Sequence, residues 1–308
     1  MAGNFPELWE ARVEQTVSTN TQAPWLEGIP ELAGSMTIVG EGSITEKCII
    51  HIAATDFEPD VLINNTTYPL DVQEYEDDTL QFTLDKYQPK VVTLSDDQAM
   101  GASYSKIDAA TTGITNAILK KKYGKAAHSL APNSHTVKTP VLVTTGETVN
   151  GRKRLTYDDL VTFRRALVGE DGDTTGLRIV LCPDHETDIL LDRKNFGDKL
   201  VNYNTGDPAP VIAGLEIYTY GNNPYYTVAT KTKKAYGSAP DSGDVRGSFA
   251  FKVSACGKKT GPTKQYYAPA AINPKTQANE LGYRHYFVAT PKKSQFIGAI
   301  ISDLVVTP

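Results

Sequence analysis

The sequence predicts an α+β fold, and three patterns support this class. Between Met100 and Ile118, apolar residues recur every three or four positions, which predicts a long helix. Leu80, Phe82 and Leu84 alternate with polar residues, the pattern of a half-buried strand. Residues 156–191 predict a helix, a turn, a buried strand and a second helix that begins at a proline. One long helix flanked by β-rich stretches on both sides favours α+β.

Residues 1–42 are predicted to form an N-terminal arm. Phe5, Leu8, Trp9 and Val13 follow Pro6 at helical spacing, which indicates a short amphipathic segment. Trp9 and Trp25 are the only tryptophans of the chain. Large aromatics near a terminus are expected to dock on something, either the chain's own body or a neighbouring subunit, and both alternatives stay open.

Residues 43–94 predict a long β excursion with an acidic tip. A strand over 43–53 leads into a turn-rich stretch, and the strand around Leu80–Leu84 and a second β run over 91–94 follow it. The tip lacks the ligand spacing of an EF-hand, so an acidic surface loop is favoured over a calcium site. The acidic tip residues are Asp71, Glu74, Glu76, Asp77 and Asp78.

The long helix is predicted to span residues 95–123. Ser95 and Gln98 form a capping box at its start, and Gly124 suits the position just beyond its end. The lysine run 120–122 has two explanations. It forms either a nucleic-acid patch or a set of cations that stabilise the helix C-terminus, and the sequence favours the second.

The rest of the chain predicts shorter elements. Thr156 and Asp159 cap a helix that ends at Gly169, Leu177–Leu181 form a buried strand, and Pro183 begins another helix. Residues 195–280 carry short β runs among glycines, prolines and tyrosines, and residues 283–290 and 296–303 predict two C-terminal strands.

The net charge of −5 hides an uneven distribution. Residues 1–100 hold 4 Lys or Arg and 18 Asp or Glu, whereas residues 101–308 hold 27 and 18. The first part therefore carries −14 and the second +9. Such asymmetry suggests an acidic segment that meets a basic partner, although acidic surface loops beside scattered lysines would give the same count.

Several protein classes are disfavoured. No stretch approaches the 18 or more apolar residues of a membrane span, and the N-terminus has no apolar core typical of a signal peptide. Three distant cysteines form no disulfide framework, and the five histidines form no metal motif. We therefore expect no membrane association, no metal and no cofactor.

Two further groups are candidates for chemistry or binding. Cys182 and His185 lie three residues apart and would be the site if the chain were a cytosolic enzyme, but Cys182 ends an apolar strand, where an inert buried thiol is expected. Basic clusters in loop-like regions are candidates for receiving an acidic neighbour or single-stranded nucleic acid. Their candidate interface lysines are Lys231, Lys233, Lys234, Lys258 and Lys259.

The order of these elements resembles that of the tailed-bacteriophage major capsid protein family, whose fold encapsulin shells share. Local patterns that resemble the family occur in the same order. They are Pro6–Glu10 in the arm, Gly40–Gly42 before the first strand, Thr83–Ser95 leading into the long helix, and Leu155–Leu160 followed by Arg178–Pro183.

The resemblance implies a capsid fold with four parts. They are an N-terminal arm (1–42), an extended β loop that reaches across a neighbour (43–94), a peripheral domain with a spine helix (95–154 and 281–308), and an α/β axial domain (155–280). The implied function is a structural shell subunit of an icosahedral-type viral head around double-stranded DNA, without an active site. An encapsulin-type nanocompartment is the alternative.

The resemblance also implies partners and location. The chain would form pentamers and hexamers with itself, and a separate scaffolding protein, a portal and in some members a decoration protein would join it. It would assemble in the host cytoplasm and reside in the virion. Affinity between subunits should come mainly from apolar anchors, of which the candidates are Phe5, Trp9, Trp25, Leu80, Phe82 and Leu84.

Overall fold

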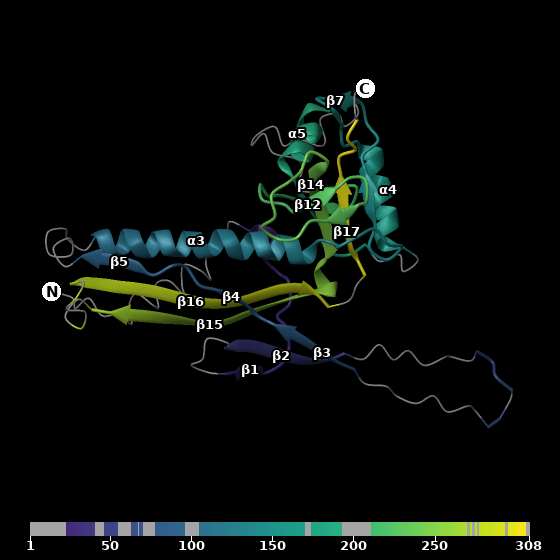
Figure 1. Cartoon of the computed structure of the whole chain (residues 1–308). Helices are drawn as coiled ribbons and strands as arrows, with labels where there is room; N and C mark the ends of the chain where they lie inside the picture. The colour runs from purple at the N-terminus through teal and green to yellow at the C-terminus, as the bar shows by residue number, and fades with distance from the viewer. Residues whose placement is uncertain are drawn as a thin grey trace.

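A computed structural model describes most of the chain. The described residues are 23–40, 46–54, 63–66, 68–69, 78–95, 105–169, 174–192, 211–269, 272, 275, 277–292 and 295–305. Of residues 53, 54, 78–80, 94, 95 and 105–109 only the backbone is described. Long strands and one long helix dominate (Figure 1). The α+β class is confirmed.

The largest layer is a mixed eight-stranded sheet in the order β10-β11-β9-β14-β12-β13, with β17 pairing to β14 and β6 pairing to β17. β9 pairs in parallel with β11, and β17 pairs in parallel with β6. The strands are β6 (Val141–Val143), β9 (Leu177–Leu181), β10 (Val211–Ile212), β11 (Leu215–Thr219), β12 (Tyr225–Thr227), β13 (Thr232–Lys233), β14 (Asp244–Lys252) and β17 (Ile297–Ile301). A short hairpin of β7 (Thr148–Val149) and β8 (Arg152–Lys153) follows β6 in the sequence.

Two helices cover one face of this sheet, and both begin where the sequence predicts. Thr156 and Asp159 form the expected capping box of α4 (Tyr157–Val168), and Gly169 ends that helix at a positive φ of 59°. α5 (Pro183–Leu191) starts at its proline. Phe163 of α4 and Ile189 of α5 pack on Ile179 in a common core cluster.

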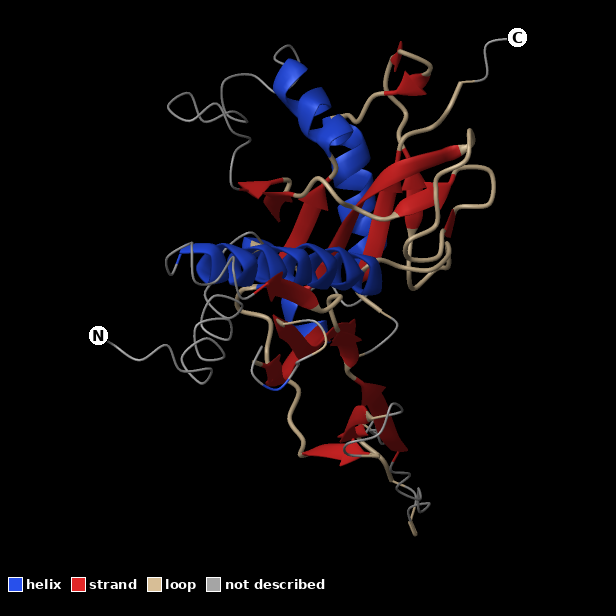
Figure 2. Cartoon of the chain, turned by 60° about the vertical axis from the view of Figure 1, so that its left-hand side comes forward, coloured by secondary structure: helices blue, strands red, loops and turns tan. Residues whose placement is uncertain are grey.

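The long helix α3 spans Ser105–Leu130 and packs against a four-stranded sheet. β16 (Ala278–Pro291) pairs with β15 (Cys256–Ala268), β4 (Asp85–Tyr87) and β5 (Val92–Ser95). Figure 2 shows α3 between the strands of the eight-stranded sheet and those of the lower sheets. Inward residues of β16, such as Leu281 and Phe287, join α3 in the core cluster that also contains Phe249 of β14.

The predicted C-terminal end of the long helix is wrong. Ser95 ends strand β5, where it pairs with Ala278, and the rest of its predicted capping box, with residues 96–104, lies outside the described residues. Gly124 lies inside α3, which continues to Leu130. A Cβ at Gly124 would lie 2.6 Å from the side-chain nitrogen of Asn222 and 3.2 Å from the Tyr236 hydroxyl. Close approach of the loop before β12 therefore explains this glycine, not a helix stop.

A second difference concerns β15, which the sequence did not predict as a strand. Its Lys258 and Lys259 were expected in a loop, but they pair with Ala289 and Val288 of β16. A register shift between Thr260 and Thr263 accommodates Gly261 and Pro262. Pairing with the long apolar strand β16 therefore overrides a composition typical of loops.

The third sheet is small, with the order β1-β2-β3, and lies on the side of β15 and β16 opposite α3 (Figure 1). Its strands are β1 (Met36–Val39), β2 (Lys47–Ala54) and β3 (Asp78–Thr83). Short 3₁₀ turns at Pro24–Leu26 and Val253–Ala255 complete the described elements.

Sheet membership cuts across the predicted domain boundaries. β15 falls within the predicted axial range 155–280, but it pairs along its length with β16, which runs beside α3. β17 falls within the range 281–308 assigned to the peripheral domain, but it pairs with β14 in the eight-stranded sheet. The four named domains remain a prediction, and these two strands lie across its boundaries.

The seam between α3 and the four-stranded sheet contains buried polar groups. His285 of β16 is 1% exposed and shares one hydrogen bond of 3.0 Å with the Thr263 hydroxyl, and its other ring nitrogen has no hydrogen-bond partner among the described residues. Burial, together with the nearby ammonium of Lys122 on α3, lowers the pKa of His285 to about 3. Burial also lowers the pKa of Lys122 to about 8, and its ammonium lies 4.4 Å from the Phe287 ring centroid.

This seam predicts acid sensitivity of the fold. Because His285 has a lower pKa in the folded state than in the unfolded chain, the unfolded state binds more protons between about pH 3 and 6.5. Stability is therefore complete above that range and falls as the pH decreases through it. Between pH 7 and pH 4.5, the free energy of unfolding of the native chain should fall by about 2 kcal/mol more than that of His285→Gln. Melting curves at the two pH values measure the difference. The exposed His51→Gln should behave like the native chain.

Candidate subunit interface

The β1-β2-β3 sheet is the base of the predicted extended loop. β2 and β3 are antiparallel, and their last register pair joins Ala54 to Asp78. The intervening residues 55–77 contain seven Asp or Glu and no Lys or Arg. The chain therefore enters and leaves an acidic excursion through two adjacent strands, which confirms the predicted strands around 43–53 and 80–84.

An apolar cluster fixes this base on the body. Cys48 and Ile50 of β2 pack with Tyr286 and Val288 of β16, and Leu84 completes the cluster at 3% exposure. Phe82 is half-buried against it. Leu84 is therefore a core residue of its own chain, contrary to its predicted place in an intersubunit contact.

A buried carboxylate reinforces the attachment. Glu46, 3% exposed, precedes β2 and accepts a 2.8 Å hydrogen bond from the Tyr286 hydroxyl. Its oxygens also lie 3.3 Å from the Arg284 guanidinium and 3.5 Å from the Lys264 ammonium. We call these four residues the Glu46 clasp. The clasp joins the loop base to β15 and β16.

Trp25 also belongs to its own chain. It is fully buried, and its ring lies 5.6 Å from both Tyr220 and Phe249, measured between centroids. Arg178 donates to the main-chain oxygens of Trp25 and Glu27. Of the two alternatives the sequence left open, docking on the chain's own body is the one observed, so Trp25 is not an exposed interface anchor.

Other predicted interface residues lie outside what the structure describes. This holds for Phe5, Trp9, Asp71, Glu74, Glu76 and Asp77. For Asp78 and Leu80 only the backbone on β3 is described. These positions remain predictions.

Four of the five candidate lysines already have partners within the chain. Lys233 donates to the main-chain oxygens of His128 and Ala131, and burial lowers its pKa to about 8. Lys234 pairs with Asp241 and Asp244. These two lysines therefore attach the β12–β13 region to the end of α3 and to its own loop.

The β15 lysines bind residues 26–32, within the range 1–42 predicted as the arm. Lys258 donates to the Leu26 oxygen at 2.9 Å, and Lys259 donates to the Leu32 oxygen at 3.3 Å and lies 3.8 Å from Glu31. No such partner is present for Lys231 within the described residues. Charge sign alone could not reveal that most of these cations hold carbonyl groups of their own chain.

The Cys182 and His185 pair does not form an accessible site. Both side chains are fully buried. The His185 ring lies between the hydroxyls of Ser248, at 2.7 Å, and Ser302, at 3.0 Å. Burial opposes the charged form of each group, while their mutual attraction lowers the pKa of Cys182 and raises that of His185. The cluster joins α5 to β14 and the end of β17, which is a structural role.

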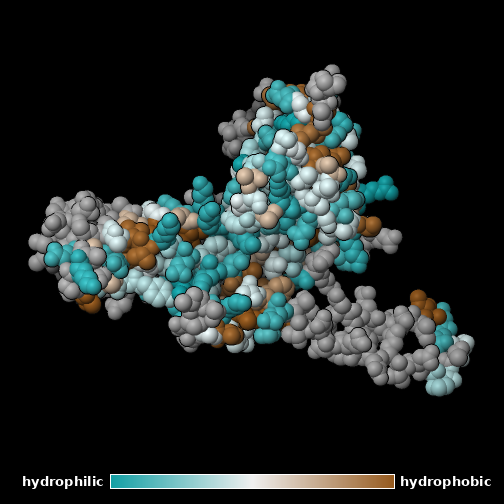
Figure 3. Space-filling view, viewed as in Figure 1, coloured by the Kyte–Doolittle hydropathy of each residue, from teal (hydrophilic) through white to brown (hydrophobic). Residues whose placement is uncertain are grey.

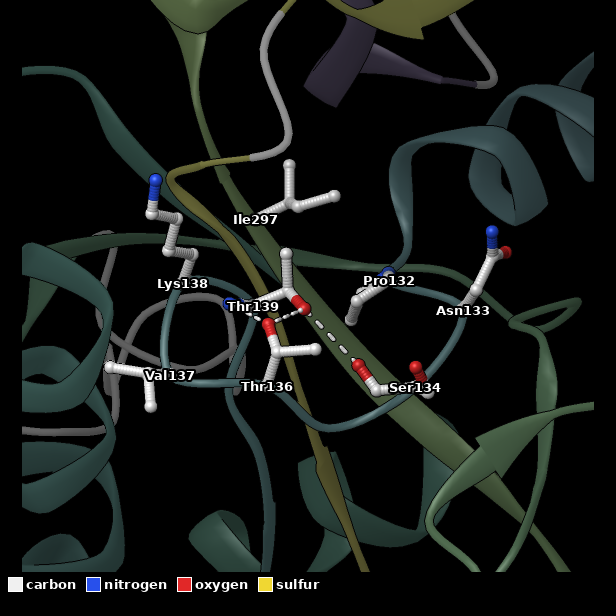
Figure 4. A pocket seen from close by; sticks show the side chains of 8 residues that line it. All are labelled: Pro132, Asn133, Ser134, Thr136, Val137, Lys138, Thr139 and Ile297. Carbon is white, nitrogen blue, oxygen red and sulfur yellow. Dashed lines mark hydrogen bonds between the residues drawn. The ribbon is translucent and has the colours of Figure 1, made fainter.

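A pocket of 430 Å³ lies beside the loop that follows α3 (Figure 4). The hydroxyl groups of Thr136 and Thr139 in this pocket hydrogen-bond to each other at 2.7 Å, and the Thr139 hydroxyl donates to the main-chain oxygen of Ser134 at 3.1 Å. No group of three or more potential metal ligands, and no helix able to span a membrane, occurs among the described residues.

Several solved structures have a similar fold. The chain is similar to the bacteriophage PhiM1 mature capsid (13% identity, 82% of this chain and 81% of that chain, TM-score 0.56) and to the capsid of a native GTA particle (10%, 93% and 91%, 0.63). It is also similar to a virus-like particle from Pyrococcus furiosus (9%, 96% and 98%, 0.55). At these identities the similarity establishes the fold, which is that of a capsid shell subunit.

A sequence family makes the identification specific. A family model described as phage capsid protein matches residues 76–301, which is most of the chain, and the chain belongs to that family. It is therefore a structural subunit of a viral capsid, as the order of its elements predicted. The comparison with curated proteins gives no match.

Proposed function

We propose that copies of this chain form pentamers and hexamers that close into an icosahedral-type head around double-stranded DNA, with each extended loop lying across the adjacent subunit. The observation that carries this proposal is the anchored β2–β3 ladder, which leads into residues 55–77 with seven acidic and no basic residues. A heterologous contact of this kind generates closed rings when the rotation between copies is correct.

Electrostatics supports the direction of the contact. The first hundred residues carry −14 and the remainder +9, so an acidic loop meets a basic body on any neighbouring copy. Complementary charge gives orientation and speed of association, and it is screened by salt. We propose a separate scaffolding protein, a portal and a decoration protein as further partners, with assembly in the host cytoplasm.

The test neutralises the loop without shortening it. Glu74→Gln, Glu76→Gln and Asp77→Asn together should reduce the yield of particles at low salt by at least about tenfold, because directional attraction between copies is lost. Particle formation is measured by sedimentation and electron microscopy. High salt should produce the same loss in the native chain while its melting temperature changes little.

A matched control removes three exposed acids from the body by Glu147→Gln, Asp158→Asn and Asp184→Asn. These changes should leave assembly intact. If the loop variant assembles like the native chain, the loop does not direct the contact. If the native chain remains a dispersed monomer at all concentrations, the proposed function is wrong.

An encapsulin-type compartment would share this fold. The family match is to phage capsid proteins, which favours the viral shell. Neighbouring genes test the alternative, since portal and terminase genes support a viral head and a gene for an enclosed cargo enzyme supports a compartment.

A further inference from the structure

The lysine run 120–122 has lost the explanation that the sequence favoured. Cations stabilise a helix only within its last turn, and α3 continues to Leu130. Lys233 reaches the final carbonyl groups instead, through the oxygens of His128 and Ala131. Lys122 is buried over Phe287, so it is a core residue. Lys120 and Lys121 remain exposed and need another role.

These two lysines lie at one end of a continuous exposed face of α3. The other exposed members of this face precede them at helical spacing, and we call the whole set the α3 face: Thr112, Gly113, Asn116, Ala117, Lys120 and Lys121. No Asp or Glu occurs between residues 110 and 130. Neither lysine side chain has an ion pair or hydrogen bond within the described part of the chain. Figure 3 shows predominantly hydrophilic surface where α3 approaches the eight-stranded sheet.

The α3 face lacks the features that a protein partner requires. Interfaces between proteins depend on buried aromatic or large aliphatic anchors surrounded by polar residues. None of the exposed large apolar side chains in the described structure lies on α3. An acidic segment of another copy would therefore find cations here but no pocket for its apolar side chains.

We propose that the α3 face binds the phosphate backbone of the double-stranded DNA that the shell encloses. Lysine ammonium groups are point-charge ligands for phosphates, and hydroxyl and amide side chains add hydrogen bonds without reading sequence. The small residues Gly113 and Ala117 leave space for close approach, since a Cβ at Gly113 would contact nothing within 4 Å. From Thr112 to Lys121 the face is about 14 Å long, enough to follow several phosphates.

The binding is weak for one subunit and strong for the shell. Two lysines neutralise about two phosphates, which gives little affinity alone. Many copies on one closed surface would present the same face to one DNA molecule. The high effective concentration of binding sites would then raise the overall affinity. This inference rests on the proposed function for the identity of the DNA, but the binding itself can be measured on the unassembled chain.

The test uses the full-length chain and a fluorescent DNA duplex at a series of salt concentrations. Replacing both lysines by Lys120→Gln and Lys121→Gln should weaken binding about tenfold at low salt and reduce the slope of log affinity against log salt by about 2. Glutamine is a good helix former, so α3 should persist. Lys120→Arg with Lys121→Arg should retain native binding, because the charge is kept. Lys138→Gln with Lys275→Gln, two exposed lysines elsewhere, should also retain it.

Particle formation by the same variants is measured as well, so that an effect on DNA binding can be distinguished from an effect on assembly. Loss of DNA binding in the glutamine pair alone, with particles still forming, supports the proposal. Unchanged affinity and salt slope in that pair would overturn it, as would loss of particles with DNA binding intact, which would assign the face to another copy of the chain. If the native chain forms no particles but the glutamine pair still loses DNA binding, the proposed function fails and the DNA-binding face stands.

Discussion

Replacing Trp25 by alanine is expected to lower the free energy of unfolding of the isolated subunit by about 3–5 kcal/mol, as for other fully buried large aromatics. The indole packs on Tyr220 and Phe249, and Arg178 donates a hydrogen bond to the main-chain oxygen of Trp25, so the variant leaves a cavity in the core beside a fixed backbone. Denaturant unfolding of dispersed subunits measures the change.

The control is Tyr157→Ala, which removes an aromatic side chain that is 41% exposed on α4. It should change stability by no more than about 0.5 kcal/mol. The opposite pattern for Trp25 would be an unchanged unfolding midpoint with a loss of assembly. That result would mean that Trp25 contacts a neighbouring subunit, the alternative that the structure disfavours.

Local patterns were sufficient wherever neighbouring residues decide the structure. The capping box at Thr156 and Asp159, the proline start of α5 and the alternation leading into Leu84 all depend on residues a few positions apart, and each gave the observed element. The C-terminal end of α3 depends on distant residues. Gly124 lies close to Asn222 and Tyr236, about a hundred positions further along the chain. A pattern of neighbouring residues cannot predict such a contact.

The same limit explains what could and could not be predicted about the interface. The charge split separates an acidic stretch from a basic remainder of the chain, because it is a property of composition. It could not distinguish a lysine that awaits a carboxylate on another copy from one already bound to its own backbone, as Lys258 is to Leu26. Conversely, Glu46 had no signal in the sequence, since a single glutamate before a strand is common.

Glu46 is the position where loss of one charge should matter most for the extended loop. Glu46→Ala removes the acceptor of the Tyr286 hydroxyl and leaves Arg284 and Lys264 without their shared carboxylate. Breaking a buried pair in this way costs about 3–5 kcal/mol, because a desolvated cation remains. Lys264 is about one-third exposed and can turn to solvent, which places the expected loss near the lower end of that range.

The matched control is Glu31→Ala, whose partner Lys259 is 3.8 Å away and whose own side chain is 66% exposed, so a loss below about 1 kcal/mol is expected. The two variants also separate stability from assembly. Because the Glu46 clasp joins β2 to β16, its loss should free the loop base first, and hydrogen exchange should rise in β1 and β2 more than in α4. Uniform exchange throughout the chain would show instead that the clasp contributes to global stability without setting the direction in which the loop leaves the body.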